Sequence, residues 1–232
     1  MTEPLVVFDL DGTLIDGYEG IADALAYAME KMGLAALPAE KVRAMVGHGL
    51  EKLIEQAAGG ERAVEGVGLF RARYPAVALE KTRLLPDVPE VLETLASRGY
   101  RMAVASNKPA AFSRLILEAR GVQSRFFAIA GPDDQTPVKP DPAMLLRLMH
   151  EAGASPAGTV AVGDMEVDSE FARAAGCRVV LVAGGSRTRE ELEDVPCDAL
   201  LDRLGELPAW LEASGLKSSR PTTIGPMKET PS

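Results

Sequence analysis

Apolar and polar residues follow one another along the chain with two different periodicities. From residue 85 onward, stretches with apolar residues three and four positions apart alternate with short, continuously apolar runs. The first pattern predicts amphipathic helices, and the second predicts strands that are buried on both faces. Such alternation is typical of a parallel sheet that is covered by helices on both sides. We therefore expect an α/β fold with a doubly wound, Rossmann-like parallel sheet.

Short apolar runs bounded by glycine, proline or polar residues mark the expected strands of this sheet. The first run ends at Phe8, and further strands are expected at residues 100–105, 126–130, 159–162, 178–182 and 199–201. Between them, helices are expected at residues 89–97, 109–120, 141–152, 167–175 and 204–211. Sheets of this kind bind ligands beyond the carboxyl ends of their strands. Functional residues are therefore expected in the segments that directly follow the strands.

Residues 17–84 carry only helical patterns. The first helix is indicated by apolar residues spaced four, four and three positions apart, which are Ile21, Leu25, Met29 and Met32. Further helices are expected from Pro38 to Val46, at residues 50–54, and at residues 61–74 with an end at Pro75. We expect a helical domain at residues 17–84 inserted into a core formed by residues 1–16 and 85–216. The tail at residues 217–232 is rich in Ser, Thr, Pro and Lys and is expected to be disordered.

Composition and charge limit the classes of partner. The 232 residues carry 25 basic and 34 acidic side chains, so the net charge is 25 − 34 = −9, which argues against a nucleic-acid-binding surface. The two cysteines, Cys177 and Cys197, lie in no metal-binding or redox motif and fit a reducing compartment. Neither a signal peptide nor a membrane-spanning stretch is evident, so no membrane partner is expected. A cytoplasmic location is predicted.

The first strand ends in two carboxylates. Asp9 and Asp11 follow the apolar run and precede Gly12 and Thr13. If the extended backbone continues past the run, both carboxylates point the same way, because side chains repeat every two residues in a strand. Two carboxylates held together require a proton or a cation between them. Taken alone, the pair is better explained as a capped strand end followed by an acidic loop.

Polar residues also follow the later strands. They are Ser106 and Asn107, then Lys139, and finally Asp164 and Asp168. Individually, the first two could cap a helix, the lysine could be solvated, and the last two could cap the helix that follows. All of them, however, fall on one edge of a parallel sheet. Carboxylate oxygens without histidine or cysteine favour Mg²⁺, and helix amino-terminal groups with a lysine favour a phosphate.

These residues form four motifs that resemble those of the haloacid dehalogenase superfamily of phosphatases. The motifs are Asp-x-Asp-Gly-Thr at residues 9–13, Ser-Asn at 106–107, Lys-Pro at 139–140 and Gly-Asp-x-x-x-Asp at 163–168. The helical insertion after the first motif is similar to the cap domain of that superfamily. Within the superfamily, Val46-Gly47-His48-Gly49-Leu50, Ser106-Asn107-Lys108-Pro109 and Lys139-Pro140-Asp141-Pro142 look most like phosphoglycolate phosphatases.

The resemblance implies a role for each motif residue. Asp9 would attack phosphorus, and Asp11 would protonate the leaving oxygen and then activate water. Mg²⁺ would be held by Asp9, the backbone carbonyl of Asp11 and Asp164, with support from Asp168. The phosphoryl group would be bound by the Ser106 hydroxyl, the Asn107 amide and Lys139, and the turn at Gly12 and Thr13 would be shaped around the phosphate.

Recognition of the rest of the substrate is assigned to the cap. Gly47 and His48 are expected at a cap tip that reaches the site, although the same Gly-His-Gly sequence also fits an ordinary turn between helices. Arg43, Lys52 and His48 are candidates to bind a substrate carboxylate, and surface charge is the default interpretation for all three. Hinges are expected at residues 16–17 and 84–86. Many relatives have serine where this chain has Gly17, so the hinge contact there is open.

The expected activity is Mg²⁺-dependent hydrolysis of a small phosphorylated metabolite through an aspartyl-phosphate, as in phosphoglycolate phosphatases. Two alternatives use the same residues: a sugar-phosphate mutase of the β-phosphoglucomutase type, and a phosphate-binding protein without turnover. The intact set of Asp9, Asp11, Lys139 and Asp164 argues against the second alternative. A monomer and a homodimer are both compatible with the sequence.

Overall fold

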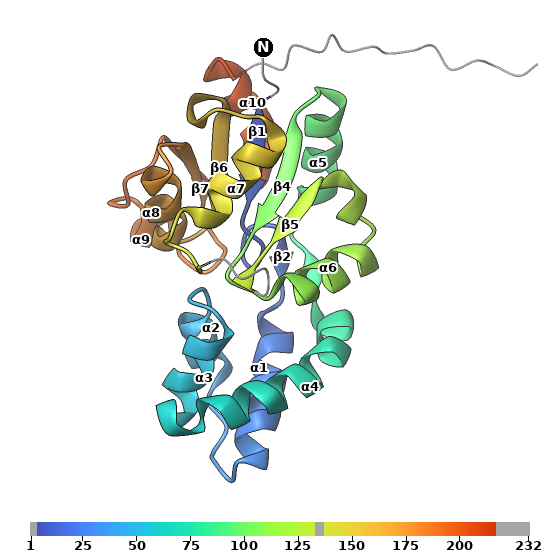
Figure 1. Ribbon diagram of the computed structural model, residues 1–232, viewed down its shortest axis with the longest axis vertical. Helices are drawn as coiled ribbons and strands as arrows, with labels where there is room; N and C mark the ends of the chain where they lie inside the picture. The colour runs from blue at the N-terminus through green and yellow to red at the C-terminus, as the bar shows by residue number, and fades with distance from the viewer. Residues whose placement is uncertain (1–3, 133–136, 217–232) are drawn as a thin grey trace, which may run out of the picture.

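A parallel six-stranded sheet forms the centre of the molecule. The computed structural model describes residues 4–132 and 137–216, and the tail for which disorder is predicted lies outside them. Within this part the strand order is β5-β4-β1-β6-β7-β8, and every neighbouring pair is parallel. The strands are β1 (Leu5–Phe8), β4 (Arg101–Ala105), β5 (Ala128–Ala130), β6 (Thr159–Gly163), β7 (Arg178–Val182) and β8 (Ala199–Leu201). Figure 1 shows β5, β4, β1, β6 and β7 side by side in the upper half of the molecule.

Helices cover both faces of this sheet. Val6 and Phe8 of β1 belong to one apolar cluster, and Leu5 and Val7 belong to the other, as expected for alternating side chains of a strand. The first cluster includes residues of α5 (Val88–Ser97), α6 (Ala110–Ala119) and α10 (Leu207–Ala213). The second includes residues of α7 (Ala143–Ala152), α8 (Glu166–Ala174) and α9 (Arg189–Leu192). The predicted doubly wound α/β fold is confirmed.

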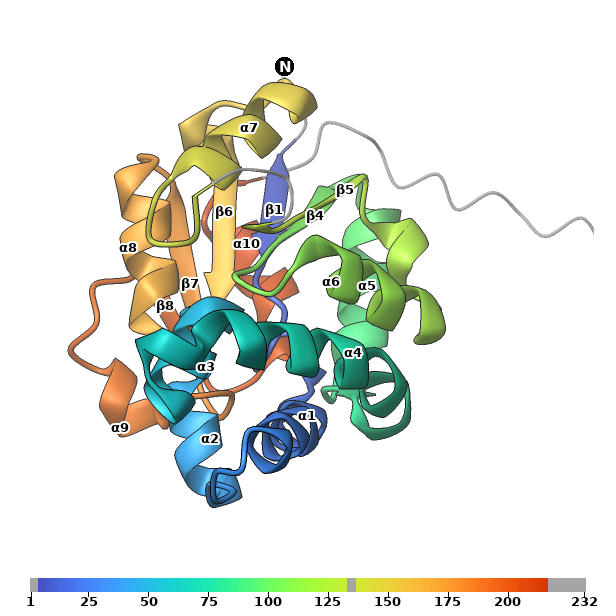
Figure 2. The same ribbon diagram turned by 60° about the horizontal axis from the view of Figure 1, so that its bottom comes forward.

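Four further helices lie against the carboxyl ends of the strands, in the lower half of Figure 1. They are α1 (Tyr18–Lys31), α2 (Ala39–Met45), α3 (Leu50–Ala58) and α4 (Ala63–Lys81), and we call them the helical insertion. Figure 2 brings this insertion forward and shows it lying across the end of β6. The chain enters through β2 (Ile15–Asp16) and returns through β3 (Arg83–Leu84), which pair as an antiparallel ribbon. The sequence did not predict this ribbon, because each strand has only two residues.

The predicted end of a helix at Pro75 is wrong. Helix α4 continues through this proline to Lys81. A proline inside a helix removes one hydrogen bond and costs about 3 kcal/mol. On either side of it, however, Tyr74, Val77 and Ala78 are almost completely buried, and burying large apolar side chains contributes about 1.5–3 kcal/mol each. Burial on both sides of the proline therefore outweighs the local preference.

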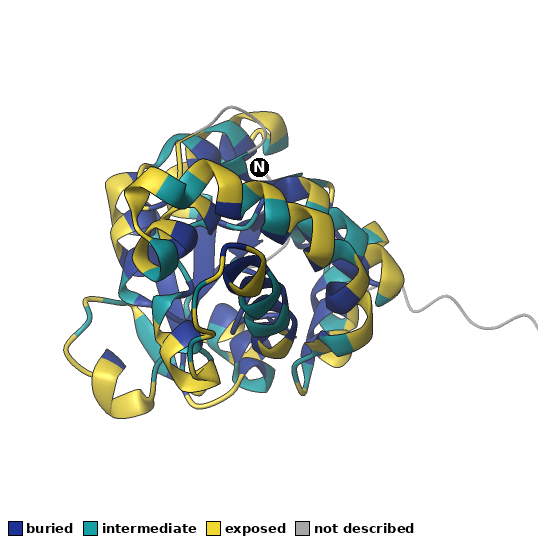
Figure 3. Cartoon of the chain, turned by 90° about the horizontal axis from the view of Figure 1, so that it is seen from below, coloured by how far each residue is buried: buried dark blue, intermediate teal, exposed yellow. Residues whose placement is uncertain are grey.

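The remaining predicted strands and most of the predicted helices agree with the structure to within about two residues at their ends. Two helices differ more: α3 ends at Ala58 rather than at residue 54, and α10 begins at Leu207 rather than at residue 204. The short helix α9, which begins at Arg189 and is capped by Thr188 in a capping box, was not predicted. Figure 3 shows the buried strands behind helices whose exposed residues lie on their outer sides. In the described part of the chain, no helix has the length and apolar character needed to cross a bilayer.

Candidate active site

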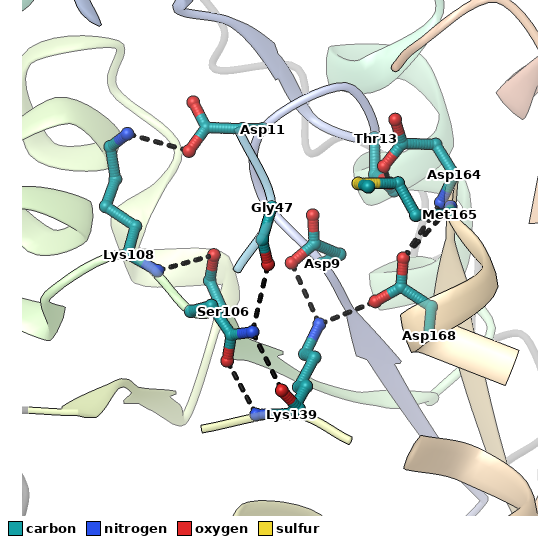
Figure 4. Close-up of polar contacts among 11 residues, drawn as sticks. Asp9, Asp11, Thr13, Gly47, Ser106, Lys108, Lys139, Asp164, Met165 and Asp168 are labelled. Carbon is teal, nitrogen blue, oxygen red and sulfur yellow. Dashed lines mark hydrogen bonds and ion pairs between the residues drawn. The ribbon is translucent and has the colours of Figure 1, made fainter. Parts of the chain in front are cut away.

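A tight turn follows β1 and separates the two acidic residues. Gly12 has φ 87°, a conformation that favours glycine, and an added Cβ there would lie 2.1 Å from Asp164 Oδ2. The strand ends at Phe8, so the alternation does not extend to Asp11. The condition for both carboxylates to point the same way, an extended backbone that continues past the apolar run, is therefore not met. Figure 4 shows that Asp9 and Asp11 contact different lysines.

Asp9 lies in a chain of buried charges with Lys139 and Asp168. The Lys139 ammonium is 2.8 Å from Asp9 Oδ1 and 2.8 Å from Asp168 Oδ1. The second oxygen of Asp168 accepts hydrogen bonds from the backbone N–H groups of Asp164 and Met165, each at 3.2 Å. Burial lowers the pKa of Lys139, but the adjacent Asp168 and Asp9 outweigh it and raise the pKa above its usual range. Lys139 is therefore held as an ammonium at the centre of the site (Figure 4).

Asp11 has its own lysine partner, which the sequence did not indicate. Lys108 Nζ lies 2.7 Å from Asp11 Oδ2, and both side chains are buried. The other oxygen, Asp11 Oδ1, has no hydrogen-bond partner among the described residues. Burial raises the pKa of Asp11, and the nearby Lys108 opposes this rise without cancelling it. The position of Lys108 directly after Ser106-Asn107 was the available signal, but lysine in a loop is usually solvated.

Asp164 completes the acidic side of the site. Its Oδ1 accepts a hydrogen bond from the Thr13 hydroxyl at 3.2 Å, and its Oδ2 accepts one from the Ser186 backbone N–H. Burial, together with the charges of Asp9 and Asp168, raises the pKa of Asp164 to about 8. A Cβ at Gly163 would lie 2.2 Å from Asp168 Cγ, so the glycine makes room for that side chain.

Three of these carboxylates are arranged to bind a cation. Asp9, Asp164 and Asp168 can each offer one oxygen atom, and these atoms lie within 4.8 Å of one another. The carboxylate of Asp11 is not in this group, because it faces Lys108. Two of the three carboxylates, those of Asp164 and Asp168, are buried, and the single Lys139 ammonium contacts only Asp9 and Asp168. The oxygen-only donor set suits a hard divalent cation.

Asn107 joins the end of β4 to two other segments of the site. Its side-chain oxygen accepts the backbone N–H of Lys139 at 2.6 Å, and its amide nitrogen donates to the Lys139 carbonyl at 3.1 Å. The same nitrogen donates to the Gly47 carbonyl at 3.0 Å. Ser106 is buried beside it, and its hydroxyl accepts the Lys108 backbone N–H at 3.3 Å. Asn107 therefore fixes the position of Lys139 and contacts the helical insertion.

Of the residues predicted to recognise substrate from the cap, one reaches the site and the others lie outside the central pocket. Gly47 reaches the site, where an added Cβ would lie 2.5 Å from Met165 Sδ. His48 is exposed and lines an outer groove with Glu51 and Lys52, and this groove shares Lys139 with the central pocket. Arg43 donates to the Gly185 carbonyl, and its guanidinium lies 4.1 Å from the centre of the Tyr18 ring. Neither Arg43 nor His48 lines the central pocket.

Tyr18 and Ser186 were not predicted at this site. The Tyr18 hydroxyl lies 2.6 Å from the Ser186 hydroxyl, and the Ser186 backbone binds Asp164. Burial and the nearby Asp164 raise the pKa of Tyr18 well above its usual range, so the phenol stays neutral. These contacts join α1 of the helical insertion to the loop after β7. The two segments are 168 positions apart in the sequence, and no local pattern indicates such a contact.

One pocket contains the central residues and lies between the sheet and the helical insertion. Its polar end is lined by Asp9, Asp11, Ser106, Asn107, Lys108, Lys139 and Asp168. Its other end is lined by apolar residues of both parts of the molecule. Acidic residues, two lysines and an amide therefore gather at the carboxyl edge of a parallel α/β sheet, beneath the helical insertion.

Comparisons with known proteins identify the family. A family model described as haloacid dehalogenase-like hydrolase matches residues 6–182. The chain is 35% identical over 219 residues to a phosphoglycolate phosphatase of Mesorhizobium japonicum, which covers 89% of this chain and 96% of that protein. It is 31% identical over 217 residues to a phosphoglycolate phosphatase of Nitrosospira multiformis, with coverage of 90% and 96%. The chain belongs to the haloacid dehalogenase-like hydrolase family.

Solved structures agree with this assignment. The crystal structure of a predicted phosphoglycolate phosphatase from Haemophilus somnus has a TM-score of 0.81 and 27% sequence identity, and covers 90% of this chain and 98% of its own. A putative haloacid dehalogenase-like hydrolase from Bacteroides fragilis has a TM-score of 0.83 and 26% identity, with coverage of 88% and 99%. Together with the named relatives, these similarities establish that the protein is a phosphatase.

Proposed function

We propose that this protein is a Mg²⁺-dependent phosphomonoester hydrolase of the phosphoglycolate phosphatase type, which acts on a small phosphorylated metabolite through an aspartyl-phosphate. The observation that carries the proposal is that the carboxylates of Asp9 and Asp11 lie in different electrostatic surroundings. Asp9 shares Lys139 with Asp168 beside the cation-binding oxygens, whereas Asp11 is paired with Lys108 on the other side of the pocket. Two carboxylates in different surroundings suit two different chemical roles.

Asp9 is the proposed nucleophile. Its carboxylate lines the pocket, and its side chain retains 13% exposure, so it can reach a bound phosphate. An oxygen of Asp9 attacks phosphorus, the bond between phosphorus and the leaving oxygen breaks, and an acyl phosphate forms on Asp9. The phosphoryl oxygens receive positive charge from Lys139 and hydrogen bonds from the Ser106 hydroxyl and the Asn107 amide. Thr13 acts indirectly, because its hydroxyl holds Asp164.

Asp11 is the proposed general acid and base. Burial raises its pKa and favours the protonated form that can protonate the leaving oxygen. The carboxylate left behind then takes a proton from the water that hydrolyses the acyl phosphate. Lys108 holds this carboxyl group at 2.7 Å on the side of the pocket away from Asp164.

Mg²⁺ would be held by Asp9 and Asp164, with Asp168 as a further oxygen donor. The three carboxylate oxygens within 4.8 Å of one another are suited to this ion. When bound, the ion supplies positive charge that lets the anionic phosphate approach the carboxylates. The helical insertion, at residues 17–84, is proposed as a cap that closes over the leaving group and excludes water, with β2 and β3 at its hinges.

The nucleophile is tested with Asp9→Asn and p-nitrophenyl phosphate. We expect turnover to fall by at least about 1,000-fold, because an amide cannot form the acyl phosphate. Wild-type enzyme quenched in acid during turnover should carry phosphate on Asp9, and the variant should carry none. Asp194→Asn is the matched control, because Asp194 is exposed in the turn after α9 and lies outside the pocket lining. Wild-type turnover by Asp9→Asn would exclude Asp9 as the nucleophile.

A further inference from the structure

Among the residues that the structure describes, the lining of the central pocket includes two cations, Lys139 and Lys108. Lys139 already lies between two carboxylates. Lys108 follows β4 and contacts only Asp11 Oδ2, at 2.7 Å (Figure 4). An ammonium group has three hydrogen-bond donors, and this contact occupies one of them. Lys108 is therefore placed to bind a further anionic group in the pocket.

The Tyr74 hydroxyl lies close to this ammonium. Lys108 Nζ is 4.9 Å from the centre of the Tyr74 ring, and both residues line the pocket. Tyr74 is completely buried, and its hydroxyl has no hydrogen-bond partner in the described part of the chain. Burial raises the pKa of Tyr74, and Lys108 opposes this rise without making a hydrogen bond of ordinary geometry. The phenol is therefore a neutral donor, and leaving it unpartnered costs free energy that a bound acceptor would recover.

Neighbouring rings hold Tyr74 in place. Its ring is stacked on Phe70, with centres 5.0 Å apart, and Phe112 meets it edge to face, with centres 4.9 Å apart. Aromatic contacts of this geometry orient the rings that make them. Tyr74 belongs to α4 of the helical insertion, whereas Lys108 follows a strand of the sheet. The two side chains, which we call the donor pair, therefore come together only where the insertion rests on the sheet.

Asp11 relates the donor pair to the leaving group. Its Oδ2 contacts Lys108, and its Oδ1 has no partner among the described residues. Oδ1 is therefore the atom that is available to the leaving oxygen. Because both oxygens belong to one carboxyl group, Lys108 lies beside the first carbon atoms of the leaving group. The free volume of the pocket is about 60 Å³, which is room for only a few water molecules, so this leaving group must be small.

We propose that Lys108 and Tyr74 bind the carboxylate of a small phosphorylated acid, in which the carboxyl group is attached to the carbon next to the leaving oxygen. The Lys108 ammonium contacts one carboxylate oxygen, and the Tyr74 hydroxyl donates to the other. A carboxylate removed from water needs both an opposite charge and hydrogen bonds, and the donor pair supplies both. This inference rests on the proposed phosphomonoesterase activity and adds the two residues that recognise its substrate.

The assignment differs from the one that the sequence suggested. Arg43, His48 and Lys52 lie outside the lining of the central pocket, whereas both members of the donor pair line it. The donor pair joins the helical insertion to the segment after β4, and a contact between such distant segments has no local signature in the sequence.

The first test compares phosphoglycolate with ethyl phosphate and with carbamoylmethyl phosphate, in which an amide of nearly the same size replaces the carboxylate. Phosphate release is measured with Mg²⁺ present. We expect kcat/KM to be at least about 10-fold higher for phosphoglycolate than for the amide, because the amide loses the charge-assisted hydrogen bonds. The amide makes the leaving alcohol more acidic, so bond breaking alone favours the opposite order. Equal values for these two substrates contradict this inference alone. A protein that releases phosphate from none of the three contradicts the proposed function itself.

The second test removes the Tyr74 hydroxyl. We expect Tyr74→Phe to lower the ratio of kcat/KM for phosphoglycolate to that for ethyl phosphate by about 10-fold. Tyr27→Phe is the matched control, because Tyr27 lies on α1 outside the pocket lining, and it should leave the ratio unchanged. A hydroxyl with a structural role lowers Tm when it is removed. Because the Tyr74 hydroxyl has no partner among the described residues, the Tm of Tyr74→Phe without substrate should be at least that of wild type. An unchanged ratio in Tyr74→Phe contradicts the inference, whatever its Tm.

The third test removes the Lys108 ammonium. Lys108→Met should lower the same ratio by about 10-fold or more, because a charged donor is lost. This variant also removes the partner of Asp11, which slows the turnover of both substrates, but the ratio is measured on one protein sample and cancels this effect and any loss of folded enzyme. Lys52→Met is the control, because Lys52 lines the outer groove, and it should keep the wild-type ratio. A loss of the ratio in Lys52→Met but not in Lys108→Met would place the carboxylate in the outer groove and contradict the inference.

Discussion

Each acidic residue of the first motif is matched with its own ammonium group. Asp9 contacts Lys139, Asp11 contacts Lys108, and both lysines are buried. Burying an unpaired charge at these positions would cost free energy, because the ion loses its hydration. The two ion pairs offset this cost for the four charges beside the pocket. The pairs also fix where each carboxylate lies. Since Lys139 is shared with Asp168, its loss should have the larger effect on the fold.

Replacing Lys139 by methionine should destabilise the protein and inactivate it. Removing one partner of a buried ion pair costs about 3–5 kcal/mol, so we expect the free energy of unfolding in metal-free buffer to fall by about 3 kcal/mol. Phosphate release should fall at least about 100-fold, because a donor to the phosphoryl oxygens is lost. Urea unfolding followed by circular dichroism measures the first effect.

Lys52→Met provides the matched control for this prediction. Lys52 pairs with Glu55 at 2.9 Å, but both side chains are about half exposed. Exposed pairs of this kind contribute about 0–1 kcal/mol, so this variant should unfold at nearly the same urea concentration as wild type. Equal losses of stability in the two lysine variants would show that burial of the Lys139 pairs is unimportant.

At the scale of elements, the loop between α2 and α3 connects the helical insertion to the site. The Gly47 carbonyl accepts a hydrogen bond from Asn107, and Asn107 also binds the backbone of Lys139. The loop can approach this closely because Gly47 has φ 118° and no side chain. A change in this loop should therefore alter the placement of the insertion over the pocket, while the sheet remains intact.

Gly47→Ala should lower activity without unfolding the protein. The new Cβ would lie 2.5 Å from Met165 Sδ and would be strained at this φ, so the loop must shift and weaken its bond to Asn107. Misplacement of about 1 Å can cost up to about 100-fold in rate, and we expect kcat/KM to fall by about 10-fold. Gly68→Ala is the control, because a Cβ there meets nothing within 4 Å in helix α4. A similar loss in both variants would contradict a role for the loop.

At the scale of the whole molecule, the sequence predicted what depends on local patterns. The strands were predictable because buried parallel strands read as continuous apolar runs, and the motif residues because they follow those strands. The pairing of Lys108 with Asp11 joins positions 97 residues apart, so no local pattern reveals it. The continuation of α4 past Pro75 likewise depends on tertiary burial of Tyr74 and Val77.

The acidic group at the carboxyl edge should make the stability of the whole molecule depend on Mg²⁺. A ligand that binds only the folded state at 100 times its Kd adds about 2.7 kcal/mol, which corresponds to a rise in Tm of about 5–10 °C for a chain of this size. We expect this rise on adding Mg²⁺ to protein treated with EDTA. Phosphate release should stop with EDTA and return with Mg²⁺.

Asp164→Asn should lose the Mg²⁺-dependent rise in Tm, because it removes one of the three carboxylates that lie within 4.8 Å of one another. Asp23→Asn is the control: it also removes one carboxylate, but Asp23 lies on α1 and pairs with Lys81 at 2.9 Å. That variant should keep the full rise, so a general effect of protein charge is separated from binding at the site. Because the readout is the shift in Tm, it does not depend on turnover. An equal shift in wild type and Asp164→Asn would place the cation elsewhere in the molecule.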